Sequence, residues 1–232
     1  MTSRLTSSQQ EALHALLVRA QALGFVGPGS VVGHINHAIE MINACEAAGA
    51  HGKLLDLGSG AGLPGLVIGA AWQSSVIVLL EVNQRRAAFL REAVQALDMR
   101  DHVSVLGKRA EESGRSTEYR AWFDMVVARG FGRPAVVAEC AAPFLRRGGR
   151  LIVSEPPLPN AGADSVPRLS GSAALRLCGS AARWPATGLS LVGLRPVGVY
   201  GEKPGFQVLE LDSDCPEKYP RRVGVPEKRP LF

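Results

Sequence analysis

The ten residues from Asp56 to Gly65 (DLGSGAGLPG) constrain the fold of this chain more than any other stretch. Lys53-Leu54-Leu55 precede them and predict a short buried strand. Alternate glycines allow the backbone to turn tightly, and Pro64 suits the first turn of a helix, where no amide donor is needed. The stretch therefore predicts a strand, a tight turn and a helix whose N-terminus faces a ligand.

Turns of this kind hold either the pyrophosphate of a dinucleotide or the amino-acid end of S-adenosylmethionine. Asp56 favours S-adenosylmethionine, because a carboxylate at the strand end attracts an ammonium group and repels a pyrophosphate. Leu63 supports the same choice, since it stands where the dinucleotide pattern has its third glycine or an alanine. The alternative is a glycine-rich loop that binds no ligand. The cofactor residues predicted in this turn are Asp56, Gly58, Ser59, Gly60, Gly62 and Leu63.

From residue 53 onward, apolar strands alternate with helices, which is typical of a parallel sheet covered on both faces. The last two strands are predicted to form an antiparallel pair joined by a turn with Gly205. The predicted fold class is α/β, with the seven-stranded, mostly parallel, Rossmann-like sheet of class I S-adenosylmethionine-dependent methyltransferases. The strands are predicted at 53–57, 76–81, 103–106, 124–128, 150–154, 195–200 and 206–212. The helices within this region are predicted near 63–72, 84–97, 134–145 and 184–191.

Three other strand ends carry candidate ligand groups, because open α/β sheets bind ligands at their carboxyl edge. Glu81 ends the second strand, where its carboxylate could accept both ribose hydroxyls or, alternatively, cap the next helix. Ala110 and Glu111 follow the third strand in a loop suited to adenine. Arg129 follows the fourth strand and needs a partner, either the ligand or an ion pair with one of the nearby acids.

The chain divides into three parts by pattern. Residues 1–50 are predicted to form a helical lead-in, 51–214 the methyltransferase domain and 215–232 a basic, proline-rich tail that is neither helix nor central strand. A proline- and glycine-rich segment at 156–171 is expected to be a loop over the active edge, either a lid or a linker. Within the lead-in, His34 and His37 share a helix face, where packing is favoured over metal or phosphate binding because no third ligand is evident.

Composition excludes several classes of protein. No apolar run is long enough to cross a membrane, and no signal peptide is evident, so we expect a cytoplasmic protein, with a monomer as the simplest state. A net charge of +5 is compatible with a polyanionic partner. The cysteines are too scattered for a zinc site, so no metal is predicted and reduced thiols are expected at Cys45, Cys140, Cys178 and Cys215.

Taken together, these motifs resemble the bacterial small-subunit ribosomal RNA guanine-N7 methyltransferases, also called the glucose-inhibited division protein B family. The resemblance covers most of the chain and rests on 56–65, 86–92 (RAAFLRE), 109–112 (RAEE), 127–129 (VAR) and the tail from 219. It implies an S-adenosylmethionine-dependent enzyme that methylates guanine N7 in 16S ribosomal RNA. The cofactor contacts that it implies are Gly58, Leu63, Ala110, Glu111 and Arg129.

The chain departs from this family on the side expected to meet the substrate. Gly27-Pro28-Gly29 replaces a family segment with Trp-Asn and Asn-Leu-Thr, and Glu155 stands where the family has a lysine. Reversing a charge near a polyanionic substrate is not a conservative change. Methylation of a small molecule, and a cofactor- or RNA-binding module without turnover, are therefore kept as alternatives.

The tail concentrates positive charge in a segment that prolines keep extended, which suits contact with an RNA phosphate backbone. A solvated terminus is the alternative. The predicted RNA contacts are Lys218, Arg221, Arg222, Lys228 and Arg229.

Overall fold

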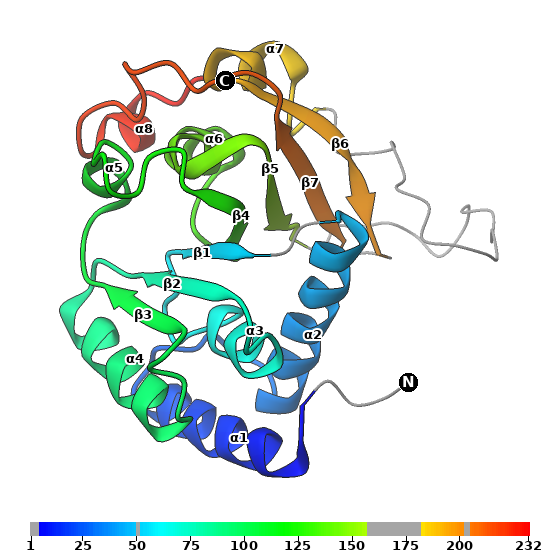
Figure 1. Ribbon diagram of the computed structural model, residues 1–232, viewed down its shortest axis with the longest axis vertical. Helices are drawn as coiled ribbons and strands as arrows, with labels where there is room; N and C mark the ends of the chain where they lie inside the picture. The colour runs from blue at the N-terminus through cyan, green and yellow to red at the C-terminus, as the bar shows by residue number, and fades with distance from the viewer. Residues whose placement is uncertain (1–4, 50–51, 157–181, 202–204) are drawn as a thin grey trace, which may run out of the picture.

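The computed structural model describes residues 5–49, 52–156, 182–201 and 205–232, and confirms the α/β fold predicted from the sequence (Figure 1). One seven-stranded sheet has the order β3-β2-β1-β4-β5-β7-β6. Its first five strands are parallel, and β7 runs antiparallel to both β5 and β6. The strands are β1 Lys53–Leu57, β2 Val76–Leu80, β3 Val103–Leu106, β4 Phe123–Ala128, β5 Leu145–Ser154, β6 Leu194–Tyr200 and β7 Phe206–Leu211.

Helices cover both faces of the sheet, as the alternation of strand side chains requires. The helices are α1 Ser7–Ala22, α2 Val31–Ala47, α3 Gly65–Ala71, α4 Gln84–Ala96, α5 Ala110–Ser113, α6 Pro134–Ala141, α7 Ala186–Leu189 and α8 Val225–Lys228, with short 3-10 turns at Ala142–Phe144 and Ser190–Val192. Figure 1 shows α1 to α4 on one side of the sheet and α5 to α8 on the other.

Each face of the sheet has its own hydrophobic core. On one face, Leu54 of β1 packs with buried residues of α1 to α4, so the helical lead-in shares a core with the domain that follows it. On the other face, Leu55 packs with residues of α6, with Trp184 and with Tyr219 of the tail. Because adjacent strand residues point to opposite faces, the apolar run of β1 serves both cores.

Most element positions were predicted to within a few residues, and the tail is the clearest correction. The tail was predicted to contain no helix, but Val225–Lys228 form one helical turn, α8. Pro226 is tolerated there because the first turn of a helix needs no amide donor. β5 is also longer than predicted, since Leu145 already pairs with Phe123 across an irregularity in the ladder.

Some sequence predictions fall on residues 157–181, outside the part of the chain that the structure describes. These are most of the loop at 156–171 and Cys178. Cys45, Cys140 and Cys215 are free thiols, and no cluster of potential metal ligands occurs among the described residues. None of the described helices combines the length and apolarity needed to cross a membrane.

Candidate functional site

The turn after β1 is fixed by its own backbone and by β2. Gly58, Gly60 and Gly62 all have positive φ, at 73°, 57° and 91°. The amides of Gly58 and Ser59 donate to the carbonyl oxygen of Leu80 at 2.9 and 3.0 Å, so the turn is hydrogen-bonded to the end of β2. Left-handed backbone at three alternate positions explains why this turn requires glycine.

Asp56 is buried at the base of this turn with half of its carboxylate unused. Its Oδ2 accepts a hydrogen bond from the Gly65 amide at 3.0 Å, while its Oδ1 is buried without a partner. Burial raises the pKa of Asp56 to about 7, although the hydrogen bond from Gly65 opposes the shift. Burying a carboxylate oxygen without a hydrogen-bond partner is energetically unfavourable. Such an oxygen is typical of a site that binds a cationic ligand.

Glu81 connects the turn to the next helix. Its Oε2 accepts from the Gly60 amide at 2.8 Å and its Oε1 from the Asn83 amide at 2.7 Å. The side chain that caps α4 belongs to Asn83, which accepts from the amides of Arg85 and Arg86, so Glu81 is not the capping side chain. Each carboxylate oxygen keeps a further lone pair for a ligand hydroxyl.

Arg129, at the end of the neighbouring strand β4, also has an unused polar atom. Its Nη2 donates to Nδ1 of His34 at 2.8 Å, and its Nη1 is buried without a partner. His34 Nε2 then carries the proton and lies 3.3 Å from the Gly27 carbonyl oxygen. Burial lowers the pKa of Arg129, and the nearby Asp56 carboxylate opposes this shift without forming an ion pair. The ion pair with a neighbouring acid, considered from the sequence, is absent among the described residues.

The loop after β3 lies at the same edge. Ala110 is buried and begins α5. Glu111 Oε1 accepts from the Gly224 amide of the tail at 3.0 Å, so this side chain connects α5 to α8. The sequence predicted both residues in a loop at this edge; they lie at this edge but form the start of the short helix α5. The sequence contained no signal for the partner of Glu111, which lies more than a hundred positions away.

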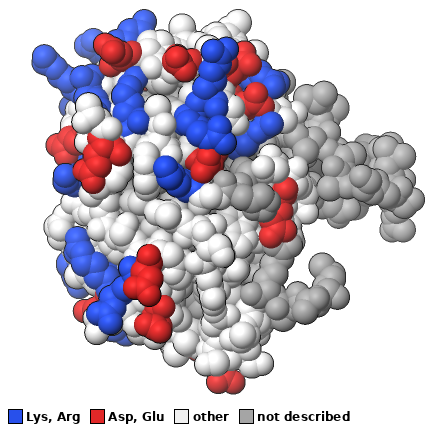
Figure 2. Space-filling view, in the orientation of Figure 1, with Lys and Arg blue, Asp and Glu red and all other residues white. Residues whose placement is uncertain are grey.

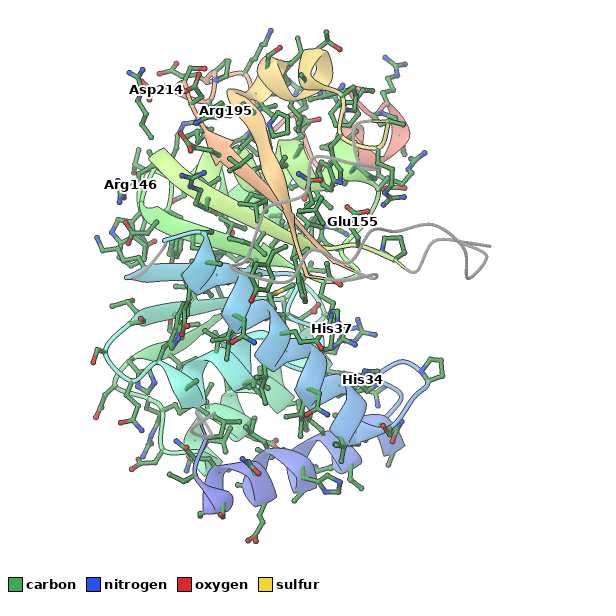
Figure 3. All side chains as sticks on the ribbon, turned by 90° about the vertical axis from the view of Figure 1, so that its right-hand side faces the viewer. His34, His37, Arg146, Glu155, Arg195 and Asp214 are labelled. Atoms are coloured by element: carbon green, nitrogen blue, oxygen red, sulfur yellow. The ribbon has the colours of Figure 1, made fainter. Side chains whose placement is uncertain are left out.

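Beside the glycine turn, the ends of β4 and β5 border a pocket of about 370 Å³. His37 of α2 enters it from one side and Glu155 from the other, as Figure 3 shows. His37 Nε2 lies 2.8 Å from Ser154 Oγ, and burial, followed by the charges of Arg129 and His34, lowers the pKa of His37 to about 4. The imidazole is therefore neutral at physiological pH.

The pocket also contains residues that sequence reasoning missed: Phe131, Arg183 and Trp184. Phe131 could have been noticed, since it lies two positions after Arg129 in the same loop. Arg183 and Trp184 carried no such signal, because they follow β5 only after a long intervening segment. Both contact Glu155: Trp184 Nε1 donates to Oε1 at 2.5 Å, and Arg183 Nε lies 2.7 Å from Oε2.

Comparison with known proteins decides the family. Residues 12–155 match the model of the family described as rRNA small subunit methyltransferase G (GidB). The chain belongs to this family.

Individual members of the rRNA small subunit methyltransferase G family agree with this assignment. The chain is 34% identical over 179 residues to the ribosomal RNA small subunit methyltransferase G of Leuconostoc citreum, covering 77% of this chain and 69% of that protein. It is 37% identical over 185 residues to the protein of the same name from Thermotoga maritima, covering 78% and 69%. Membership makes the chain a methyltransferase, as the sequence predicted.

Solved structures support the fold alone. The cofactor-bound protein Rv0187 from MTB superposes with a TM-score of 0.57 at 17% identity, covering 88% of this chain and 91% of that one. A putative O-methyltransferase from Klebsiella pneumoniae gives 0.56 at 13% identity, covering 90% and 91%.

In this member of the methyltransferase G family, the tail is folded onto the domain. Arg221 donates from its backbone amide, Nε and Nη2 to the fully buried carboxylate of Glu139, at 2.8, 2.8 and 2.5 Å. Arg120 donates to the Tyr219 carbonyl oxygen at 2.8 Å. The Arg221 guanidinium is therefore paired with Glu139 within the chain. The other four predicted RNA contacts, Lys218, Arg222, Lys228 and Arg229, are exposed.

Gly60 allows the predicted cofactor position to be tested without a steric clash inside the protein. A Cβ added at Gly60 would lie 3.9 Å from its nearest neighbour, the Gly58 carbonyl oxygen. Gly60→Ala should therefore cost only the left-handed strain, about 1 to 2 kcal/mol, and should weaken S-adenosylmethionine binding about tenfold or more by intruding on the ligand. The measurement is calorimetric titration of the folded variant.

Gly148→Ala is the matched control for Gly60→Ala. Gly148 also has a positive φ, 78°, and open space around its Cβ, but it lies near the start of β5, at the opposite edge of the sheet. It should show the same loss of stability with unchanged cofactor affinity. Equal affinity in the Gly60 and Gly148 variants would place the cofactor elsewhere.

Proposed function

We propose that this chain transfers a methyl group from S-adenosylmethionine to N7 of a guanine in small-subunit ribosomal RNA. The names of the relatives supply the substrate class, and the resemblance in sequence supplies the methylated atom. Such a substrate places the reaction in the cytoplasm.

The observation that carries the cofactor assignment is a pair of unused buried atoms on neighbouring strands. Asp56 Oδ1 and Arg129 Nη1 are both buried without partners, at the ends of β1 and β4. One is an anion and the other a cation, yet they do not pair with each other. A zwitterionic amino-acid group satisfies both, since its ammonium suits Asp56 and its carboxylate suits Arg129. The methionine end of S-adenosylmethionine is such a group.

The remaining groups fit the nucleoside part of this cofactor. Glu81 has lone pairs for ribose hydroxyls, and Ala110 begins the helix beside which adenine would lie. Asp56, Gly58, Ser59, Gly60, Gly62, Leu63, Glu81, Ala110, Glu111 and Arg129 remain the proposed cofactor residues. When bound, the cofactor supplies a methyl group attached to a positively charged sulfur.

Methylation of guanine N7 requires few catalytic groups from the protein. Guanine N7 has an exposed lone pair and carries no proton, so no general base is needed. The work of the chain is to hold the base in line with the methyl donor and to exclude water, and orientation alone supplies much of the rate. The lowered pKa of His37, about 4, makes this imidazole a weak base, which is consistent with a reaction in which no proton has to be accepted.

The test is transfer of labelled methyl groups from S-adenosylmethionine. We expect label in ribosomal RNA when small ribosomal subunits lacking the modification are supplied. We expect none in a protein-free, RNA-free small-molecule extract. Label confined to the small-molecule fraction, or cofactor binding without transfer to any fraction, would reject the proposal.

The exposed tail cations are expected to contribute to RNA binding. Replacing Arg222, Lys228 and Arg229 together with glutamine should lower affinity for ribosomal RNA about tenfold. It should also flatten the slope of log affinity against log salt by roughly one to three units. Substitution is preferable to truncation, because the tail packs on the domain.

The control for this variant removes three charges elsewhere. Arg146 and Arg147 lie near the start of β5, and Arg195 lies near the start of β6. Figure 3 shows Arg146 and Arg195 on the other side of the sheet from Glu155 and His37. Figure 2 shows that acids lie among the cations in the upper part of the molecule. Arg146 pairs with Asp124, and Arg195 with Glu210, so glutamine at the three control positions should leave the salt slope unchanged. If the salt slope flattens equally in both variants, RNA binding depends on the net charge of the protein and not on the position of the tail cations.

A further inference from the structure

We propose that Glu155 is the specificity-determining residue of an acceptor-base pocket. In this assignment its carboxylate accepts hydrogen bonds from N1–H and from the N2 amino group of guanine, and it stabilises the cationic 7-methylguanine that methyl transfer creates. This inference rests on the proposed function, and it assigns the base to the pocket between α2, the loop after β4 and the end of β5.

The pocket is next to the cofactor turn. Phe131 lines the pocket and also packs on the turn, since a Cβ added at Gly58 would lie 2.5 Å from Phe131 Cδ2. Arg129, which is proposed to hold the cofactor carboxylate, lines the same pocket. A base in the pocket would therefore lie directly beside the methyl donor, at the edge where open α/β sheets bind their ligands.

The walls of the pocket suit a flat, aromatic ligand. The half-buried Phe131 provides aromatic surface, and the almost fully buried side chains of Trp184, Val137 and Val153 also line the pocket. A base taken out of an RNA strand is held in this way, by stacking between aromatic and apolar side chains and by hydrogen bonds to its Watson–Crick edge. Aromatic faces also attract a cation, so they favour the methylated base over the unmethylated one.

Glu155 brings to this pocket a carboxylate that can read the edge of guanine. Trp184 Nε1 and Arg183 Nε each bind a different carboxylate oxygen, at 2.5 and 2.7 Å, which fixes the plane of the carboxylate. Each oxygen keeps a further lone pair. Guanine presents two donors side by side, N1–H and the N2 amino group, which match two carboxylate oxygens. Adenine presents an acceptor at N1 and is rejected.

The charge change of the reaction favours an acid at this position. The N7 lone pair forms the new N–CH3 bond, the S–CH3 bond breaks with its electron pair remaining on sulfur, and the positive charge passes from sulfur to the purine ring. No proton is lost. Hydrogen bonds from a cationic ring to a carboxylate are stronger than those from a neutral ring, so Glu155 binds the product form better than the substrate form. His37 is neutral and does not oppose this charge.

Glu155 could instead act only as an anchor for the segment that contains Arg183 and Trp184. An anchor would affect stability but would not distinguish a cationic base from a neutral one. The ratio of affinities for 7-methylguanosine and guanosine monophosphates therefore separates a specificity role from a structural role.

The experiment measures binding of guanosine, 7-methylguanosine and adenosine 5′-monophosphates by equilibrium dialysis. S-adenosylhomocysteine is present at saturation, so that the cofactor site is closed to nucleotides and no turnover occurs. We expect the wild-type protein to bind 7-methylguanosine monophosphate about tenfold more tightly than guanosine monophosphate, and adenosine monophosphate most weakly. Glu155→Gln should reduce the tenfold preference to twofold or less, with unchanged affinity for S-adenosylhomocysteine.

The chain offers a matched control in Glu210. Its side chain is 14% exposed, and its carboxylate pairs with Arg150 and Arg195 at 2.6 and 3.0 Å; the side chain of Glu155 is 13% exposed. Glu210→Gln should have a similar effect on thermal stability and should retain the tenfold preference. If Glu155→Gln does not fold, Trp184→Phe serves instead: it removes the indole N–H that orients Glu155 and keeps a smaller aromatic ring at this position, and it should reduce the preference in part.

An unchanged preference in Glu155→Gln, equal binding of guanosine and adenosine monophosphates, or no binding of any nucleotide would overturn the assignment of Glu155. These outcomes do not decide the proposed function, which labelled transfer into ribosomal RNA tests separately. Methylated RNA together with an unchanged nucleotide preference would reject the role of Glu155 and retain the reaction.

Discussion

Asp56→Asn is expected to weaken S-adenosylmethionine binding about 30- to 100-fold at pH 8. Asparagine can still accept the hydrogen bond from the Gly65 amide, but it offers no charge to the ligand ammonium. A hydrogen bond between charged groups contributes about 1.5 to 3 kcal/mol, which corresponds to this range of affinity. Calorimetric titration measures the loss directly.

The pH dependence of cofactor binding gives a second readout for the same variant. The Asp56 carboxyl has a pKa of about 7 in the free protein, and only its ionised form attracts the ammonium group. Wild-type affinity should therefore fall up to tenfold per pH unit below about pH 7 and approach that of the asparagine variant. A difference between the two proteins that stays constant from pH 8 to pH 5.5 would contradict the proposed contact.

Stability should respond to pH with the opposite sign. Because burial raises the Asp56 pKa from its ordinary value to about 7, the folded protein binds a proton that the unfolded chain has released. The free energy of unfolding contributed by this group therefore falls as the pH rises from about 4 to about 7, by up to roughly 1.4 kcal/mol per unit. The difference in unfolding free energy between wild type and Asp56→Asn isolates this contribution.

Asp124 provides the control for both measurements. Although partial burial raises its pKa, hydrogen bonds from the Lys53 amide and from Arg146 lower it overall, and it lies near the start of β4. Its stabilising contribution is therefore present above about pH 4 and is lost as the pH falls below that value. Asp124→Asn should destabilise the protein at neutral pH and leave cofactor affinity unchanged.

Arg221→Ala is expected to destabilise the protein by about 3 to 5 kcal/mol, or roughly 10 °C in Tm. The Glu139 carboxylate is 0% exposed, and its hydrogen bonds come from the backbone and guanidinium of Arg221. Truncating Arg221 leaves a buried charge without its counter-ion, which is the costly way to break such a pair. Thermal and urea unfolding measure the loss.

Arg222 is the matched control for Arg221, because it is the next residue in the chain and is exposed. Arg222→Ala should change stability by less than about 0.5 kcal/mol. The double variant Glu139→Leu with Arg221→Met replaces the ion pair by two apolar side chains. It should recover much of the stability lost in Arg221→Ala. If both alanine variants are equally stable and both weaken RNA binding, Arg221 contacts RNA, as the sequence suggested, and the pair with Glu139 does not anchor the tail.

The sequence was sufficient for the sheet and for the glycine turn because both are encoded locally. The apolar runs of β1 and β2, the glycines of the turn and Asp56 lie close together in the chain, and their pattern predicts the strand ends. The parallel topology then brings Glu81 and Arg129 to the same edge without further information.

Contacts between distant segments could not be predicted in this way. Arg129 was expected to bind a ligand or a nearby acid, and nothing in the sequence indicated that its hydrogen-bond partner within the chain is His34, 95 positions away. Glu155 was recognised as an unusual acid, yet its partners Arg183 and Trp184 carried no motif of their own. The tail was interpreted from its charge, whereas burial of Glu139 determines the position of Arg221. Such pairings depend on packing, which a single sequence does not encode in any short pattern.

The most direct test of the central proposal is nucleoside mass spectrometry of 16S ribosomal RNA after incubation of unmodified small subunits with the protein and S-adenosylmethionine. We expect one new 7-methylguanosine per RNA with the wild-type protein and at most a few per cent of that amount with Asp56→Asn under the same conditions. A methylated base other than 7-methylguanosine, or unmodified RNA from a protein that binds S-adenosylmethionine normally, would contradict the account.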